Sequence, residues 1–161
     1  MNVIKYLAAA SFVMALTAMT GALAAPLASV GTLTIPAPFG SSPVLAWSWG
    51  ASNSGTTHEG GGGGAGKANI QDLSITRYAD GQSPLFFNAV VMGQHQPTVV
   101  LVDGSTTIML TEVLITSYST GDSPDAKNTT RTENITFNFA KISYTVNGVT
   151  TCYNIAASTA C

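Results

Sequence analysis

The chain has little charge: Asp, Glu, Lys and Arg make up 9% of its 161 residues, with eight acidic and six basic side chains. Binding to phosphate backbones needs clustered lysines and arginines. The scarcity of charge therefore argues against nucleic acid as a partner. A weakly charged surface also repels other copies of itself poorly, so we expect self-association.

The sequence also lacks a long membrane-spanning run. Its apolar segment Tyr6–Met19 is short and rich in Ala and Thr, whereas a spanning helix needs roughly 20 strongly apolar residues. Lys5 precedes this segment and Ala22-Leu23-Ala24 follows it, which is the three-part pattern of a cleavable export signal. We predict that residues 1–24 are removed by cleavage after Ala24, or one residue later. The protein would then be exported, to the periplasm or outside the cell, with a net charge of about −3 from five basic and eight acidic side chains.

Cysteine is scarce as well, with only Cys152 and Cys161 present. Their spacing does not fit a C-x-x-C redox or metal site. Two cysteines in an exported chain predict one disulfide. Such a bridge stabilises the folded state by roughly 2–3 kcal/mol in the chain-entropy model. Here it would hold the C-terminal tail against the domain.

Catalytic and metal-binding motifs are missing too. No G-x-S-x-G nucleophile motif occurs. His58 and His95 have no ligand spacing, and metal sites usually need three or four ligands, so the pair is only a weak candidate for metal binding or general-base chemistry. Asp122 and Asp125 lie in a Ser/Gly/Pro-rich loop, which favours a solvated loop over a calcium site or a glycosidase pair. We predict no enzyme, no cofactor and no metal.

Gly61 to Lys67 matches the start of a phosphate-binding loop, G-x-x-x-x-G-K. The next residue, Ala68, cannot supply the Ser/Thr hydroxyl that holds magnesium. The segment that follows has strand-like alternation, so no helix N-terminus would face a phosphate. Exported proteins also meet no nucleoside triphosphates. We expect no nucleotide partner and a flexible loop instead.

The remaining pattern predicts a mainly β domain. Strands are indicated by apolar alternation, and Asn147-Gly148 is a strong two-residue hairpin turn. Near Ala140-Lys141 the alternation changes phase, as a β-bulge or a change of sheet produces. Trp47 and Trp49 share one strand face, either as core or as an aromatic platform for a sugar or a subunit contact. The strands expected from this pattern cover Leu33–Ile35 (an edge strand), Val44–Gly50, Ala68–Tyr78, Val99–Val102, Thr107–Tyr118 (one or two strands), Ile135–Val146 and a strand from Val149.

One short helix is predicted at about 83–93. Ser83 is a good N-cap, Pro84 fits the first helical position and Gly93 can end the helix. Its apolar residues recur at helical spacing, so it would be an amphipathic helix on a sheet. The residues expected on its apolar face are Leu85, Phe86, Ala89, Val90 and Met92.

The fold class expected is therefore a small antiparallel β-barrel, or two packed sheets, with one helix. Residues 1–24 form the export signal and 25–43 an extended N-terminal arm. Residues 44–161 form the β-domain, which includes a long Gly-rich loop at 51–66. A run of five glycines, Gly60–Gly64, cannot hold a packed conformation alone.

From about Val44 to Val146 the sequence resembles the Hcp family, the tube proteins of bacterial type VI secretion. No single motif is diagnostic, but their order and spacing over roughly 100 residues are fairly specific. The matching motifs are Trp47-Ser48-Trp49-Gly50, His58-Glu59-Gly60, Gly64-Ala65-Gly66-Lys67, Gln71-Asp72, Ser83-Pro84-Leu85, Gly93-Gln94-His95, Val113–Tyr118 and Glu133–Tyr144.

The resemblance implies a structural role. Members of that family form a small β-barrel, assemble into hexameric rings that stack into a hollow tube, and carry effector proteins in the lumen. Segment 51–66 corresponds to the family's extended loop, which contacts the neighbouring ring. The assembly residues expected in this loop are His58, Glu59, Gly60, Gly61, Gly62, Gly63, Gly64, Gly66 and Lys67.

Four hypotheses follow. The first is an exported Hcp-like protein that forms rings or tubes, with the arm at 25–43 free to add a strand to a neighbour. The second is a type VI component whose N-terminal segment is not cleaved. The third is a monomeric secreted binding module, for a glycan or a host surface, that reuses the fold. An enzyme is the fourth and has the least support.

Overall fold

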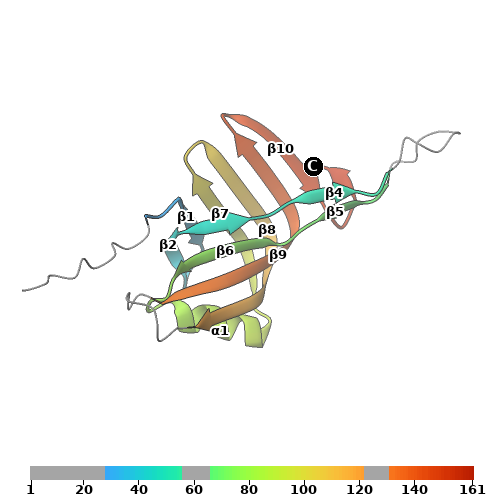
Figure 1. Ribbon diagram of the computed structural model, residues 1–161. Coiled ribbons are helices and arrows are strands. Elements are labelled where there is room, and N and C mark those ends of the chain that lie inside the picture. The colour runs from blue at the N-terminus through green and yellow to red at the C-terminus, as the bar shows by residue number, and fades with distance from the viewer. Residues whose placement is uncertain (1–27, 56–65, 122–130) are drawn as a thin grey trace, which may run out of the picture.

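The computed structural model describes residues 28–55, 66–121 and 131–161 (Figure 1). The predicted fold class is confirmed: these residues form a mainly β domain, and within them there are one short helix and two sheets, the larger with nine strands and the smaller with two. None of the helices in these ranges is long and apolar enough to cross a membrane. The elements are β1 (Gly31–Ile35), β2 (Gly40–Val44), β3 (Ala46–Ser48), β4 (Ala51–Asn53), β5 (Ala68–Ile70), β6 (Leu73–Tyr78), α1 (Ser83–Met92), β7 (His95–Asp103), β8 (Thr106–Gly121), β9 (Thr132–Val146), β10 (Val149–Asn154) and β11 (Thr159–Ala160).

Strand β9 organises the large sheet. One of its edges pairs with β8, and the other is shared, first with β6 over residues 132–137 and then with β10 over residues 141–146. Beyond β8 the order continues through β7 and β1 to β2. Only Leu45 separates β2 from β3, and β3 pairs with β6. The path from β9 through β8, β7, β1 and β2 continues along the chain into β3. Because β3 pairs with β6 and β6 pairs with β9, the path returns to β9 on the other side of the core.

The core is one apolar cluster inside this curved sheet. Its members come from β1, β2, the turn between these two strands, β6, α1, β7, β8 and β9, so residues far apart in sequence meet there. The buried hydrophobic residues are Leu33, Ile35, Phe39, Val44, Leu73, Ile75, Phe86, Ala89, Val99, Leu101, Ile108, Leu110, Val113, Ile115, Ile135, Phe137, Phe139 and Ile142.

A bend crosses the three longest strands at one level. The expected phase change in β9 is confirmed: Phe139 and Ile142 are buried while the two residues between them are not. The same pattern of two consecutive outward residues occurs at Pro97 in β7 and at Glu112 in β8. Glu112 has a φ of 54°, and such a left-handed residue is typical of a sharp local kink. The bend lets the sheet curve around the core without turning its apolar side outward.

The N-terminal segment from residue 31 is not an extended arm. The strand expected at Leu33–Ile35 exists as β1, but it is not an edge strand, because it pairs with β2 on one side and β7 on the other. Leu33 and Ile35 are buried in the core. Both sides of β1 are already hydrogen-bonded, so this strand has no free edge to offer a neighbouring molecule.

Two predicted strands are each divided. The stretch Val44–Gly50 splits at Leu45, where the chain stops pairing with β1 and starts pairing with β6. The stretch Ala68–Tyr78 splits between Ile70 and Leu73 into β5, which pairs only with β4, and β6. In both cases the partner strand changes, and sequence alternation does not report the partner.

Helix α1 is confirmed within one residue of its predicted bounds. The residue before the helix is Gln82 rather than Ser83, whose Oγ instead accepts a hydrogen bond from the Asp80 N–H at 2.9 Å. Gly93 ends the helix with a left-handed φ of 60°. Met92 was expected on the apolar face, but it is 67% exposed. At 100° per residue it lies about 120° around the helix from Phe86, outside the face that meets the sheet.

Candidate assembly surface

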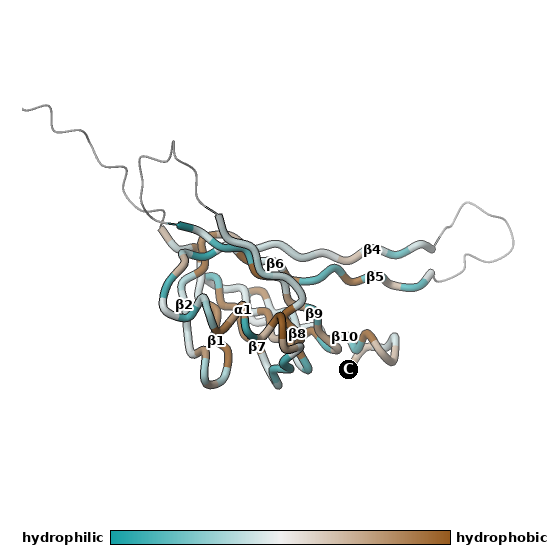
Figure 2. Tube along the Cα trace, turned by 90° about the horizontal axis from the view of Figure 1, so that it is seen from below, coloured by the Kyte–Doolittle hydropathy of each residue, from teal (hydrophilic) through white to brown (hydrophobic). Residues whose placement is uncertain are grey.

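Strands β4 and β5 form a two-stranded ribbon that extends away from the core (Figures 1 and 2). All three residues of β4 are exposed, as is Asn69 of β5. Near the outer end, the Asn53 Nδ2 donates to the Gly66 carbonyl at 3.0 Å, and Asn53 Oδ1 accepts from the Gly55 N–H at 2.7 Å. A Cβ on Gly66 would lie 2.1 Å from the Gly55 nitrogen, so only glycine fits there.

Of the nine residues predicted for the assembly loop, the structure describes Gly66 and Lys67, and both belong to this ribbon. Lys67 is exposed and directly precedes β5, so a strand and not a helix follows the G-x-x-x-x-G-K motif. The other seven, His58, Glu59 and Gly60 to Gly64, lie outside the described residues, as do Asp122 and Asp125.

The base of the ribbon is held by hydrogen bonds that the sequence did not reveal. The Gln71 N–H donates to the Gly50 carbonyl at 2.8 Å. The adjacent Asp72 accepts from Asn138 Nδ2 at 2.8 Å and from Thr116 Oγ1 at 3.4 Å. These contacts tie the ribbon to β8 and β9. The direction in which it projects is therefore set by the core domain.

Trp47 and Trp49 are half-buried and pack against the core cluster. The Trp47 Nε1 donates to Asp103 Oδ2 at 2.9 Å. The Trp49 ring meets the Tyr144 ring edge-on, with 5.3 Å between centroids. Both indoles thus have partners within the domain, which favours the packing interpretation over an exposed aromatic platform.

A buried charge cluster lies between α1, β6 and β9. Arg77 and Glu133 are a directly paired cross-strand couple, 1% and 0% exposed, with 3.4 Å between Arg77 Nε and Glu133 Oε1. Arg77 also pairs with Asp80 and donates to Gln82 Oε1 at 3.2 Å. Its guanidinium lies 5.1 Å from the centroid of the Phe86 ring. Buried charges persist when they are paired, and this cluster fixes α1 against the sheet.

Tyr118 completes the cluster by donating from its hydroxyl to Glu133 Oε2 at 2.9 Å. Burial raises the pKa of Tyr118 above its ordinary value of 10.0, and the hydrogen bond to Glu133 and the charge of that carboxylate raise it further. The neutral hydroxyl is therefore the form that the folded protein favours.

This pKa direction predicts an alkaline loss of stability. Below pH 10 the contribution is fully present, because the tyrosine is protonated in both the folded and the unfolded chain. As pH rises from 10 through the folded-state pKa, only the unfolded chain loses its proton, so stability falls. We expect Tyr118→Phe to reduce the slope of unfolding free energy between pH 9.5 and 11, measured by urea denaturation. An unchanged slope in Tyr118→Phe would contradict the assignment.

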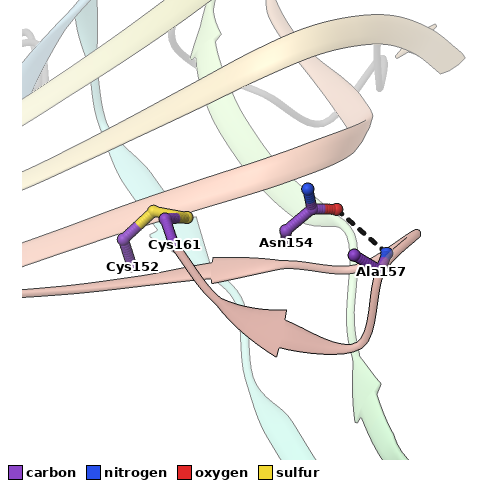
Figure 3. Close-up of a disulfide and its surroundings, with 4 residues drawn as sticks. All are labelled: Cys152, Asn154, Ala157 and Cys161. Atoms are coloured by element: carbon purple, nitrogen blue, oxygen red, sulfur yellow. Dashed lines mark hydrogen bonds between the residues drawn. A yellow bond between two sulfur atoms is a disulfide. The ribbon is translucent and has the colours of Figure 1, made fainter.

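The two cysteines form the predicted disulfide (Figure 3). Cys152 lies in β10 and Cys161 follows β11, so the bridge closes the C-terminal hairpin. Within that hairpin the Asn154 Oδ1 accepts from the Ala157 N–H at 3.1 Å, as Figure 3 shows. The Ile155 N–H donates to the Ala140 carbonyl at 2.9 Å. The tail is therefore fixed to the bend in β9.

His95, the second weak metal candidate, lies exposed at the start of β7. It lines a groove of about 680 Å³ on the outer side of the bend, with Glu112, Leu114 and Ile155 among its neighbours. Within residues 28–55, 66–121 and 131–161, no three His, Cys, Asp or Glu side chains gather in a way that could hold a metal ion.

The described domain combines a curved β-sheet, one helix and a projecting two-stranded ribbon. The family model described as "Type VI secretion system effector, Hcp" matches residues 31–146. The chain therefore belongs to the Hcp family. The match begins at β1, ahead of the Val44 at which the sequence motifs begin, in agreement with the place of β1 and β2 in the core.

Individual relatives agree with this assignment. Protein hcp1 of Pseudomonas aeruginosa is 47% identical over 85 residues, which cover 47% of this chain and 51% of that protein. The match thus spans about half the length of the curated relative. Among solved structures, a type six secretion system protein superimposes with a TM-score of 0.75, and Hcp1 from Salmonella typhimurium with 0.69. Each is 20% identical, with 83% of this chain and 100% of the other covered, so these two show the fold alone.

Proposed function

We propose that this protein is an exported Hcp-like subunit that assembles with copies of itself into rings, which stack into a type VI secretion tube and carry effector proteins. Hexameric rings are the expected form. The role is structural and not catalytic. Membership of the Hcp family supports the proposal, and so does a surface with very little charge.

The single observation that carries the proposal is the ribbon. Its strands contribute little to the core, since β4 is wholly exposed and β5 is at most half-buried. A two-stranded extension that contributes little to the core is expected to gain stability from another contact, because an isolated hairpin is marginally stable in water. A neighbouring ring would supply that contact.

Shortening the ribbon tests this idea. Gly50 and Gln71 form a hydrogen-bonded pair, and such pairs alternate along an antiparallel ladder. Ser52 and Asn69 are therefore the next such pair, and a two-residue Asn-Gly turn fits between them. We expect the variant in which residues 53–68 are replaced by Asn-Gly to fold normally and to lose stacking, giving single rings in place of tubes by negative-stain electron microscopy.

The protein should be expressed with its own N-terminal segment and purified from the exported fraction, and its N-terminus should be sequenced. Circular dichroism of both forms provides the folding control. Tubes that persist unchanged in the shortened variant would refute the role of the ribbon, and an unmodified protein that stays monomeric would refute assembly itself. An N-terminus at Ala25 supports cleavage of the export signal, whereas an intact Met1 identifies a type VI component with an uncleaved extension.

A further inference from the structure

The outer side of the large sheet carries a face without any charged residue. The strand registers place two continuous rows of side chains across six neighbouring strands, from β2 through β1, β7, β8 and β9 to β10. We call these two rows the neutral face. The first row is Pro43, Thr32, Val102, Thr107, Thr145 and Thr150, and the second is Ser41, Thr34, Val100, Met109, Ser143 and Cys152.

Each of these twelve residues is exposed or half-buried. Of the large apolar residues at the centre, Val102 and Met109 are 42% and 43% exposed and Val100 is half-buried. Hydroxyl pairs on the face satisfy each other: Thr34 with Ser41 at 2.9 Å, and Thr145 with Thr150 at 2.8 Å. Six strands at about 4.8 Å spacing give a face about 24 Å wide. The neutral face is therefore wide, with paired hydroxyl groups toward its two edges and apolar side chains at its middle.

A second neutral patch lies on helix α1, which contains no charged residue. Phe87, Val91 and Met92 are 55%, 59% and 67% exposed. Phe87 and Val91 are four residues apart, so they share one side of the helix. We call these three residues the helix patch. The helix patch and the neutral face together hold five of the seven exposed large hydrophobic residues in the described part of the chain.

In Figure 1, helix α1 lies beside one end of the long strands, whereas the neutral face crosses β8 near its start, at Thr107 and Met109. The Phe87 ring meets the Tyr118 ring, with 6.2 Å between centroids, near the end of β8. Met109 stands near the start of the same strand, nine residues earlier, which corresponds to up to about 30 Å of extended chain. They cannot cover each other within one molecule.

We infer that the neutral face of one copy packs against the helix patch of the next copy, head to tail. Neither patch holds a charged group that would have to be desolvated on contact. Depletion of charged residues and enrichment of Met are typical of the cores of protein interfaces. A nucleic acid, an anionic membrane or an acidic peptide would find no opposite charge within the two patches, and Lys141 in the next row of the sheet is a single cation. A glycan would find no aromatic ring on the neutral face to stack on. A contact between two different patches is heterologous, which is the type that builds rings or filaments.

This pairing rests on the proposed assembly and names its subunit contact. The test uses the full exported chain with one charge in each patch: Met109→Lys in the neutral face and Val91→Glu in the helix patch. Met109 is 43% and Val91 59% exposed in the monomer, so both variants should fold. We expect each to weaken association at least about tenfold, because an unpaired charge is buried in the contact. Sedimentation velocity measures this, and Ser119→Lys, an exposed β8 residue outside both patches, is the matched control.

The double variant decides the matter. In a head-to-tail contact the new lysine of one copy meets the new glutamate of the next, so Met109→Lys with Val91→Glu should regain association. Single variants that assemble like the unmodified chain would overturn the inference, and so would a double variant that stays dissociated. A monomeric unmodified chain would instead refute the proposed function on which the pairing rests.

Discussion

Replacing Glu133 by alanine is expected to lower the free energy of unfolding by about 3–5 kcal/mol, because the change breaks a buried ion pair. Glu133 is 0% exposed and its partner Arg77 is 1% exposed. The substitution also removes the acceptor of the Tyr118 hydroxyl. Of its ion pairs within the described residues, Arg77 would keep the one with Asp80, whose side chain is 47% exposed, together with its hydrogen bond to Gln82. Urea denaturation followed by circular dichroism provides the measurement.

Two variants control this experiment. Glu112→Gln alters an exposed acid on the neighbouring strand and should change the unfolding free energy by no more than about 0.5 kcal/mol. Replacing both partners, Arg77→Met with Glu133→Leu, should cost less than Glu133→Ala alone, because no charge is left buried without its partner. If the double replacement is the more damaging of the two, the pair itself is not the source of the loss.

Phe86→Ala should be equally severe, with an expected loss of about 3–5 kcal/mol from the cavity that it leaves. Phe86 is 1% exposed, and its ring centroid lies 4.9 Å from that of Phe39. It also supports the Arg77 guanidinium. Removing the ring therefore loosens the helix, the hairpin β1–β2 and the charge cluster together. Thermal unfolding monitored by near-UV and far-UV circular dichroism should show a lower, still cooperative transition.

The neighbouring phenylalanine is the matched control. Phe87 is 55% exposed, so Phe87→Ala should cost about 1 kcal/mol or less. Both variants should be unfolded at high dilution, so that association does not add to the measured stability. Equal losses in the two variants would mean that the helix does not bury the face assigned to it.

Local patterns in the sequence predicted several elements closely. Pro84 and Gly93 bracket the helix because each has a conformational preference that acts within a few residues. Asn147-Gly148 forms the expected turn, with positive φ at both positions, and brings Val149 opposite Val146. Cys152 and Cys161 are joined as expected. The phase change at Ala140-Lys141 could be predicted because it alters the alternation of apolar and polar residues within a single strand.

The predictions from the sequence were wrong where the position of an element depends on the segments that pack against it. The pattern Leu33-Thr34-Ile35 is the same for an edge strand and an inner strand. Only the pairing of β1 with β7, in which Leu33 lies opposite Leu101, places it inside the sheet. Met92 was assigned to the apolar face because its type fits, yet the sheet meets a narrower side of the helix. Arg77 and Glu133 gave no sequence signal as a pair, since 56 residues separate them.

The fold class, the helix, the C-terminal turn, the disulfide and the resemblance to the Hcp family could be predicted from the amino-acid sequence, because each depends on residue types at short spacing or on ordered motifs. Only the three-dimensional arrangement showed which strands share an edge, how the ribbon is tied to the domain, and that Arg77 and Glu133 lie buried together. It also showed that the neutral face and the helix patch lie far apart on the molecule. These properties depend on strand register, and register is set by contacts between distant segments that must all be satisfied at once.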